Sequence, residues 1–283
     1  MQSPPQNRAD PARREANGWR ALLADALRPP PPGWLRWGLP GLPLGWLSPD
    51  RLALLQAVLP GCRLHAAAGL LIWEEGQGLA PAERSLRLQR AALQLRAQGL
   101  VPGWRDEAYA CEQPVDDPTR QRGAELFRLE RAAFRVLGLM SRAAHVNGFR
   151  PDGRLWCGRR AASKATDPGL LDNLAAGGLP AGEALADCAR RELFEEAGVP
   201  AALSAGLRAQ GAVRVRRPVA EGLHDEVLQV YRLELPMDFV PRNQDGEVSE
   251  FLCLTPVEAL ARCQAGEFTP DAAAVLACGL LGR

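Results

Sequence analysis

A glycine-rich loop followed by a carboxylate-rich segment, over residues 177–199, constrains this sequence more than any other stretch. Its spacing predicts a helix over residues 182–197, on which Glu192, Glu195 and Glu196 stand at i, i+3 and i+4 and share one face. Three carboxylates this close repel one another, and a cation would relieve the repulsion. Mg²⁺ or Mn²⁺ suits such oxygen ligands, because these ions bind through a few carboxylates together with substrate phosphates. Taken alone, however, three glutamates more often mark a solvated helix face.

The complete segment is more specific than its glutamates. It fits the pattern G-x5-E-x7-R-E-U-x-E-E-x-G-U, in which U is a bulky aliphatic residue, and the positions are filled by Gly177, Glu183, Arg191, Glu192, Leu193, Glu195, Glu196, Gly198 and Val199. Seven fixed residues at this spacing would recur by chance in roughly one such chain in a million. On these residues the second half of the chain resembles the Nudix hydrolases.

The resemblance implies both a fold and a reaction. The fold is a mixed sheet sandwiched between helices, of class α/β (α+β), and the reaction is attack of water on a diphosphate linked to an organic group. Glu192, Glu195 and Glu196 would hold Mg²⁺ (or Mn²⁺), Arg191 would orient these carboxylates, and Glu183 would support the loop. The ion would clamp the phosphate oxygens and lower the pKa of the attacking water.

The general base is open between two places in the chain. Glu195 or Glu196 of the helix is one candidate, and the acidic loop over residues 245–251 supplies Glu247 and Glu250 as the other. Either kind of carboxylate can accept the proton of water. Alternatively, Glu247 and Glu250 are charged residues beside a strand and have no role in the reaction.

A wider resemblance indicates the substrate. Residues 145–149, 156, 159–160, 163–169 and 171–174 are similar to the Nudix subgroup related to fungal thiamine pyrophosphokinase fusions. This subgroup carries an N-terminal partner domain. It implies a small-molecule substrate, thiamine diphosphate or its oxidised analogues, which is cut to the monophosphate and phosphate.

Substrate contacts are expected from four residues before the helix. Lys164 is the one lysine among 34 basic residues, and in the loop leading to the helix it could meet a diphosphate as a compact point charge. Arg159 and Arg160 alternate along an expected strand, so we expect only one of them to face the site. Asn173 completes the set.

Three other functions compete with this one. A pyrophosphatase for ADP-ribose or another nucleoside diphosphate derivative needs the same glutamates but a different pocket. Isopentenyl diphosphate isomerase needs a reactive cysteine and a histidine-rich metal site, neither of which is evident. A non-catalytic binding or regulatory module usually loses motif carboxylates, and none is missing from residues 177–199.

The length of 283 residues corresponds to about two domains. We expect an N-terminal α+β partner domain of unknown role over residues 1–135 and a Nudix domain over residues 136–283. Helices are expected over residues 13–27, 48–58, 81–99, 124–137 and 182–197 and from near residues 255 and 269; strands are expected over 70–75, 104–112, 155–160, 213–217, 226–235 and 251–256, with short strands and turns over 34–46.

Charge and cysteine content narrow the partners and the compartment. The net charge of +1 predicts neither nucleic acid nor a membrane as a partner. Seven scattered cysteines without a C-x-x-C pair argue against a disulfide framework and against a zinc ribbon. No secretory signal or long apolar run is visible, so a cytoplasmic location is expected. Monomer and homodimer stay equally open.

Overall fold

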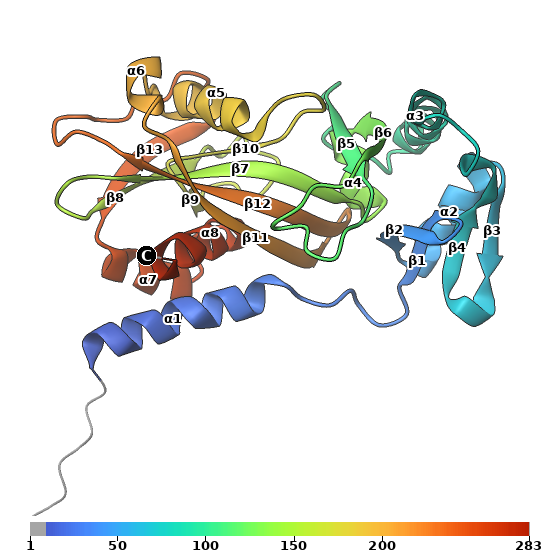
Figure 1. Ribbon diagram of the computed structural model, residues 1–283, viewed down its shortest axis with the longest axis horizontal. Coiled ribbons are helices and arrows are strands. Elements are labelled where there is room, and N and C mark those ends of the chain that lie inside the picture. The colour runs from blue at the N-terminus through green and yellow to red at the C-terminus, as the bar shows by residue number, and fades with distance from the viewer. Residues whose placement is uncertain (1–9, 283) are drawn as a thin grey trace, which may run out of the picture.

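A run of buried residues forms β7 (Met140–Phe149), the central strand of a seven-stranded mixed sheet in the computed structural model, which describes residues 10–282 (Figure 1). The main strand order is β11-β12-β7-β8-β13, and the short strands β10 and β9 pair with β7 and β8. β7 runs parallel to β12 and antiparallel to β8 and β10. A strand with neighbours on both sides and layers on both faces is buried along its length, and in β7 four of the buried residues are polar: Ser141, Arg142, His145 and Asn147.

Helices cover both faces of this sheet (Figure 1). α5 packs on β10 and β7, whereas α8 packs on β7, β11 and β12 from the other side. The elements of this half are β7, β8 (Leu155–Arg160), β9 (Leu171–Asp172), β10 (Ala175–Gly178), α5 (Leu185–Ala197), α6 (Ala201–Ser204), β11 (Arg208–Val219), β12 (Gly222–Glu234), β13 (Val248–Leu254), α7 (Pro256–Gln264) and α8 (Pro270–Leu281). The predicted fold class, a mixed sheet between helices, is confirmed.

The first half forms a smaller α+β unit with its own hydrophobic core. Its strands make a four-stranded sheet in the order β2-β1-β4-β3 and a separate pair, β5-β6. Its elements are α1 (Pro11–Ala26), β1 (Leu35–Leu39), β2 (Leu42–Leu47), α2 (Pro49–Val58), β3 (Cys62–His65), the 3₁₀ turn η1 (Ala66–Ala68), β4 (Leu70–Trp73), η2 (Glu74–Gly76), α3 (Pro81–Ala97), β5 (Ala108–Glu112), β6 (Glu125–Glu130) and α4 (Arg131–Val136).

The first helix does not share that core. α1 crosses to the second half and packs on α8, and its Trp19 is 2% exposed among residues that include Phe149 and Leu276 (Figure 1). The division near residue 135 stays a prediction. Because α1 packs on the second half, the core of that half includes a helix from the beginning of the chain.

Two predicted elements differ most from the observed ones, and the helix expected over 182–197 begins only at Leu185. Residues 124–137 were expected to be helical, but 125–130 form β6, which pairs with β5, and only 131–136 form a helix. The expected strand over 104–112 begins only at Ala108, because Asp106 has φ +57° and breaks the extended backbone. Pairing between distant segments outweighs local helix propensity here.

No helix within residues 10–282 is both long enough and apolar enough to cross a membrane.

Candidate active site

Two glycines fix the ends of the carboxylate-bearing segment. A Cβ at Gly177 would lie 2.0 Å from Oε1 of Glu192, so only glycine lets this carboxylate lie against the loop. After α5, Gly198 adopts φ +64°, and the amide of Val199 donates to the carbonyl of Leu193 at 3.0 Å. This left-handed residue and its hydrogen bond are typical of a helix end. The loop and the helix are thus held in one geometry.

Arg191 links three of the carboxylates. Its Nη1 donates to Glu192 at 2.6 Å and to Glu195 at 3.1 Å. Its Nε and Nη2 each donate to Glu183 at 3.0 Å, which is a bidentate pair. Hydrogen bonding to Glu183 raises the pKa of Arg191, so the guanidinium stays charged. One cation therefore fixes the directions of two side chains predicted to bind metal.

Glu196 is the buried member of the group. Its Oε2 accepts a hydrogen bond from the amide of Ala176 at 2.8 Å. Burial, together with the charge of Glu192, raises the pKa of Glu196 to about 8, and burial also raises the pKa of Glu192. A cation would offset this cost, and carboxylate oxygens are the donors that Mg²⁺ and Mn²⁺ prefer. The residues present therefore fit such an ion.

Lys164 lies between the helix and the acidic loop. Its Nζ is 3.8 Å from Oε1 of Glu196, and it donates a hydrogen bond to Glu247. Burial lowers the pKa of Lys164. The ammonium thus joins two carboxylates from distant parts of the chain.

A cavity of about 450 Å³ opens beside these groups. Glu192, Glu195, Lys164 and Glu247 line it, together with residues of the first half of the chain, among them Tyr109, Arg131 and Arg135. Arg135 donates to the hydroxyl of Thr166, in the same loop as Lys164, at 2.9 Å. The first half therefore forms part of the wall of the cavity.

Four residues predicted to be catalytic, to bind metal or to bind substrate do not line this cavity: Arg159, Asn173, Glu196 and Glu250. Glu196 is buried. Arg159 and Glu250 pair with each other on neighbouring strands, and neither lines the cavity. Asn173 is buried in a network instead, bonded to His145 and Asn147 at 2.8 Å each. Side chains of successive strand residues point to opposite faces, which is why Arg160 reaches the cavity and Arg159 does not.

Two further residues lie close to Arg160, His145 and Asp172, and the sequence analysis gave neither a role in the site, although both belong to the stretches that carry the wider resemblance. Asp172 accepts from Arg160 at 2.9 Å and lies 3.9 Å from His145, and all three line the cavity. Their signal is weak in the sequence, because the pairing of Asp172 with Gly158 across strands is what brings the aspartate to the site.

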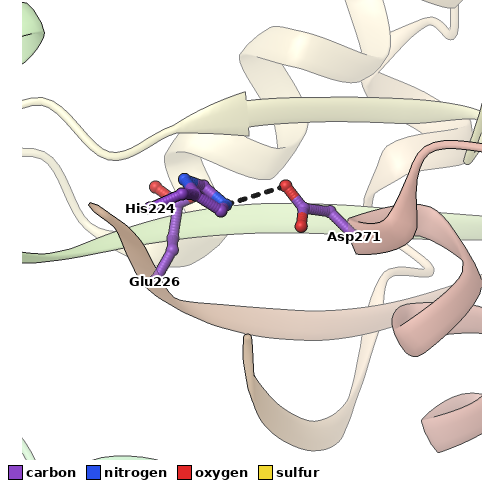
Figure 2. Close-up of side chains that lie close together, drawn as sticks. All are labelled: His224, Glu226 and Asp271. Atoms are coloured by element: carbon purple, nitrogen blue, oxygen red, sulfur yellow. Dashed lines mark hydrogen bonds and ion pairs between the residues drawn. The ribbon is translucent and has the colours of Figure 1, made fainter. Parts of the chain in front are cut away.

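Sequence reasoning also missed a second polar cluster, formed by His224, Glu226 and Asp271 (Figure 2). All three residues line the same cavity. His224 and Glu226 alternate on β12, and Asp271 comes from the first turn of α8. Nε2 of His224 lies 3.0 Å from Asp271 and 3.8 Å from Glu226, a grouping that could hold a metal ion. Asp271 also pairs with Arg217.

These contacts already account for Asp271 without an ion. Burial alone would raise the pKa of Asp271, but its contacts with His224 and Arg217 lower it overall. The cluster joins α8 to β12. The sequence did contain one signal for this cluster: His224 and Glu226 are polar residues two positions apart, so in a strand they lie on the same face.

Comparison with known proteins decides the family. The NUDIX domain model matches residues 139–277. An uncharacterized Nudix hydrolase of Pseudomonas aeruginosa, PA4841, is 34% identical over 157 residues, which are 56% of this chain and 85% of that protein. The chain belongs to the Nudix family. The segment with its three glutamates lies within the matched Nudix domain.

Other Nudix proteins are similar over parts of their length. Nudix hydrolase 24, chloroplastic, of Arabidopsis thaliana is 40% identical over 184 residues, which are 64% of this chain and 48% of that protein. The chain thus spans about half the length of such plant relatives. Among solved structures, DR0079 of Deinococcus radiodurans is 25% identical, with a TM-score of 0.47, covering 60% of this chain and 97% of that one.

Proposed function

We propose that this Nudix chain is a Mg²⁺-dependent hydrolase of a diphosphate attached to an organic group. Our first choice of substrate is thiamine diphosphate or an oxidised analogue, with the monophosphate and phosphate as products. The observation that carries the proposal is the carboxylate group of α5: Arg191 holds Glu192 and Glu195 at the cavity, and Glu196 of the same helix is buried, with Lys164 3.8 Å away. Family membership alone would not require every carboxylate of the motif to be present.

The chain's own residues have distinct tasks in this reaction. Glu192, Glu195 and Glu196 would hold Mg²⁺, which when bound neutralises charge on the phosphate oxygens and lowers the pKa of water. Arg191 keeps two of these carboxylates in place through its hydrogen bonds. Lys164 brings a positive charge to the cavity, where the oxygens of a diphosphate can replace Glu247 as its partner.

The hydrolysis needs one proton acceptor. The oxygen of water forms a bond to one phosphorus, the bond between that phosphorus and the bridging oxygen breaks, and the bridging oxygen leaves with the other phosphorus. A carboxylate takes the proton of the attacking water. Glu247 is the loop candidate that lines the cavity, whereas Glu250 does not, and Glu195 or Glu196 is the alternative on the helix.

The choice of substrate rests on the resemblance of residues 145–149 and 163–174 to the thiamine-related subgroup. A pyrophosphatase acting on ADP-ribose or another nucleoside diphosphate derivative is the rival. A panel of thiamine diphosphate, oxythiamine diphosphate and ADP-ribose separates the two. Faster turnover of ADP-ribose than of both thiamine compounds would reject our first choice.

The variant Glu196→Gln tests the metal site. Because the amide cannot supply a negative charge to the ion, we expect Mg²⁺-dependent phosphate release to fall by at least about a hundredfold, a drop of about 2.7 kcal/mol in transition-state stabilisation. The circular dichroism spectrum and melting temperature should stay close to those of the wild type.

The matched control is Glu234→Gln, an exposed glutamate of β12 outside the cavity. It should keep wild-type turnover. If Glu196→Gln also keeps it, the metal site is assigned to the wrong residues.

A further inference from the structure

Tyr109 places an unused hydrogen-bond donor at the cavity. It lies on β5 in the first half of the chain, is 6% exposed, and packs edge-on against Phe134 with ring centres 5.6 Å apart. The guanidinium of Arg131 lies 5.4 Å from its ring centre. Within residues 10–282, no hydrogen bond engages its hydroxyl, although the side chain lines the cavity. The ring is buried but the hydroxyl oxygen is not closed off from the cavity, so it is free to donate to a ligand there.

The hydroxyl lies against Gly178, the last residue of β10, from which the chain continues to α5. A Cβ at Gly178 would lie only 1.6 Å from Oη of Tyr109. Burial raises the pKa of Tyr109, so its hydroxyl keeps a proton to donate. A donor from the first half of the chain therefore stands next to the loop that precedes the metal-binding helix.

Glu226 offers an acceptor in the same cavity (Figure 2). Its Oε1 accepts from the hydroxyl of Ser141 at 2.7 Å, and its Oε2 lies 3.8 Å from His224. In the part of the chain that the structure describes, no arginine or lysine lies within 4.0 Å of this carboxylate, whereas Asp271 is paired with Arg217. Glu226 thus keeps the capacity to accept from a ligand.

The register of β7 orders these groups along the cavity. Ser141, Ala143 and His145 alternate on one face of the strand and all line the cavity. Ser141 pairs with Glu226, Ala143 with Gly178, and His145 with Ala176, whose amide binds Glu196. Four residues of strand span about 13 Å. Moving away from Glu196, a ligand therefore meets Tyr109 first and Glu226 next.

We propose that Tyr109 and Glu226 form a subsite that reads the organic group of the substrate by hydrogen bonds. This subsite rests on the proposed function, because the diphosphate must lie at α5 for the organic group to reach Glu226. A neutral hydroxyl donor and a carboxylate acceptor complement a nitrogen heterocycle with a ring acceptor and an amino donor. Aminopyrimidine rings have this chemistry.

The test changes the amino group of the substrate ring to an oxo group, and the carboxylate at position 226 to an amide. Thiamine diphosphate and oxythiamine diphosphate differ by an amino group replaced with an oxo group. A carboxylate only accepts hydrogen bonds, whereas the amide of Glu226→Gln also donates. We expect Glu226→Gln to shift the ratio of kcat/KM for the two compounds about tenfold towards the oxo compound.

Tyr109→Phe tests the other half of the subsite. It removes the hydroxyl but keeps the ring packing, so KM should rise about fivefold with kcat little changed. Tyr231→Phe replaces the chain's other tyrosine, and Glu234→Gln replaces a glutamate of the same strand as Glu226; both lie outside the cavity and should match the wild type.

The outcomes separate the subsite from the proposed function. An unchanged amino-to-oxo ratio in Glu226→Gln, with both thiamine compounds hydrolysed, overturns the subsite and leaves the function standing. If the wild type hydrolyses neither thiamine compound, that choice of substrate fails. The same variants are then measured with ADP-ribose and its hypoxanthine analogue. These two compounds also differ by an amino group replaced with an oxo group. An unchanged ratio there, or no hydrolysis of either pair, overturns the subsite.

Discussion

Glu196 combines burial and repulsion in a single residue. Its carboxylate is buried, near Glu192 on the same helix, and Lys164 is 3.8 Å away. Helical spacing is sufficient to predict that Glu192, Glu195 and Glu196 share a face, because i, i+3 and i+4 always do so. How deeply each one is buried depends on β10 and on Lys164, which local spacing does not specify.

The raised pKa of Glu196 predicts how metal binding depends on pH. Its folded pKa of about 8 lies above the ordinary value of 4.5, so the metal-free protein should lose stability as the pH rises between these values. A bound metal ion replaces the proton, so Mg²⁺ affinity should increase as the pH rises towards 8. Calorimetric titration with Mg²⁺ at several pH values measures the affinity and the number of protons released.

Glu196→Gln serves as the reference for this measurement. The amide does not titrate, so the residual affinity of the variant should vary much less between pH 6 and about 8. A wild-type affinity that is constant over this range would contradict the prediction.

At the residue scale, the sequence could not predict which side chains at a strand face the cavity. Glu247 and Glu250 were equal candidates, yet only Glu247 lines the cavity. The pairing of β13 with β8 shifts register between Val248 and Glu250. Such an irregularity redirects the side chains that follow, and it depends on the partner strand rather than on local sequence.

At the scale of elements, capping signals were more reliable than periodicity. The Thr-Pro pairs at residues 255 and 269 predict helix starts, and both threonine side chains accept backbone hydrogen bonds at the first turns of α7 and α8. Residues 125–130 instead pair as β6 with β5, a partner that their own sequence does not reveal. Local signals therefore predict elements well when the elements are stabilised locally.

α1 gives a prediction about stability. Trp19 is buried against the second half of the chain, so Trp19→Ala should lower the free energy of unfolding of that half by about 3–5 kcal/mol. Urea unfolding followed by circular dichroism measures the change. Leu86→Ala, at an exposed residue of α3, is the control and should cost about 0.5 kcal/mol or less. Equal effects of the two variants would show that α1 does not stabilise the second half.

For the whole molecule, the main feature is that one cavity has walls from both halves. The sequence motif predicts the metal-binding helix, but Tyr109 and Arg131 come from a region for which no role could be predicted. The approach of Tyr109 to Gly178 depends on how the halves pack, and no periodicity in the sequence predicts it. The substrate question therefore involves the first half as well.

Gly178→Ala tests this junction. The added methyl group would overlap Oη of Tyr109, so the loop or β5 must move. We expect a lower melting temperature and a weaker Mg²⁺ affinity. Tyr109→Phe in the same chain should restore part of both losses, because it removes the closest atom. Purely additive effects in the double-mutant cycle would show that the two residues do not act on each other.

The position of α1 has a consequence for how the chain folds during synthesis. α1 leaves the ribosome long before α8, the helix on which it packs. The core of residues 37–139 can form before α8, on which α1 packs, has been synthesised. Contacts between such distant segments form slowly because the loop between them must first be ordered. Trp19 is therefore exposed on the nascent chain until α8 emerges. During that interval the apolar face of α1 is open to aggregation and to binding by chaperones.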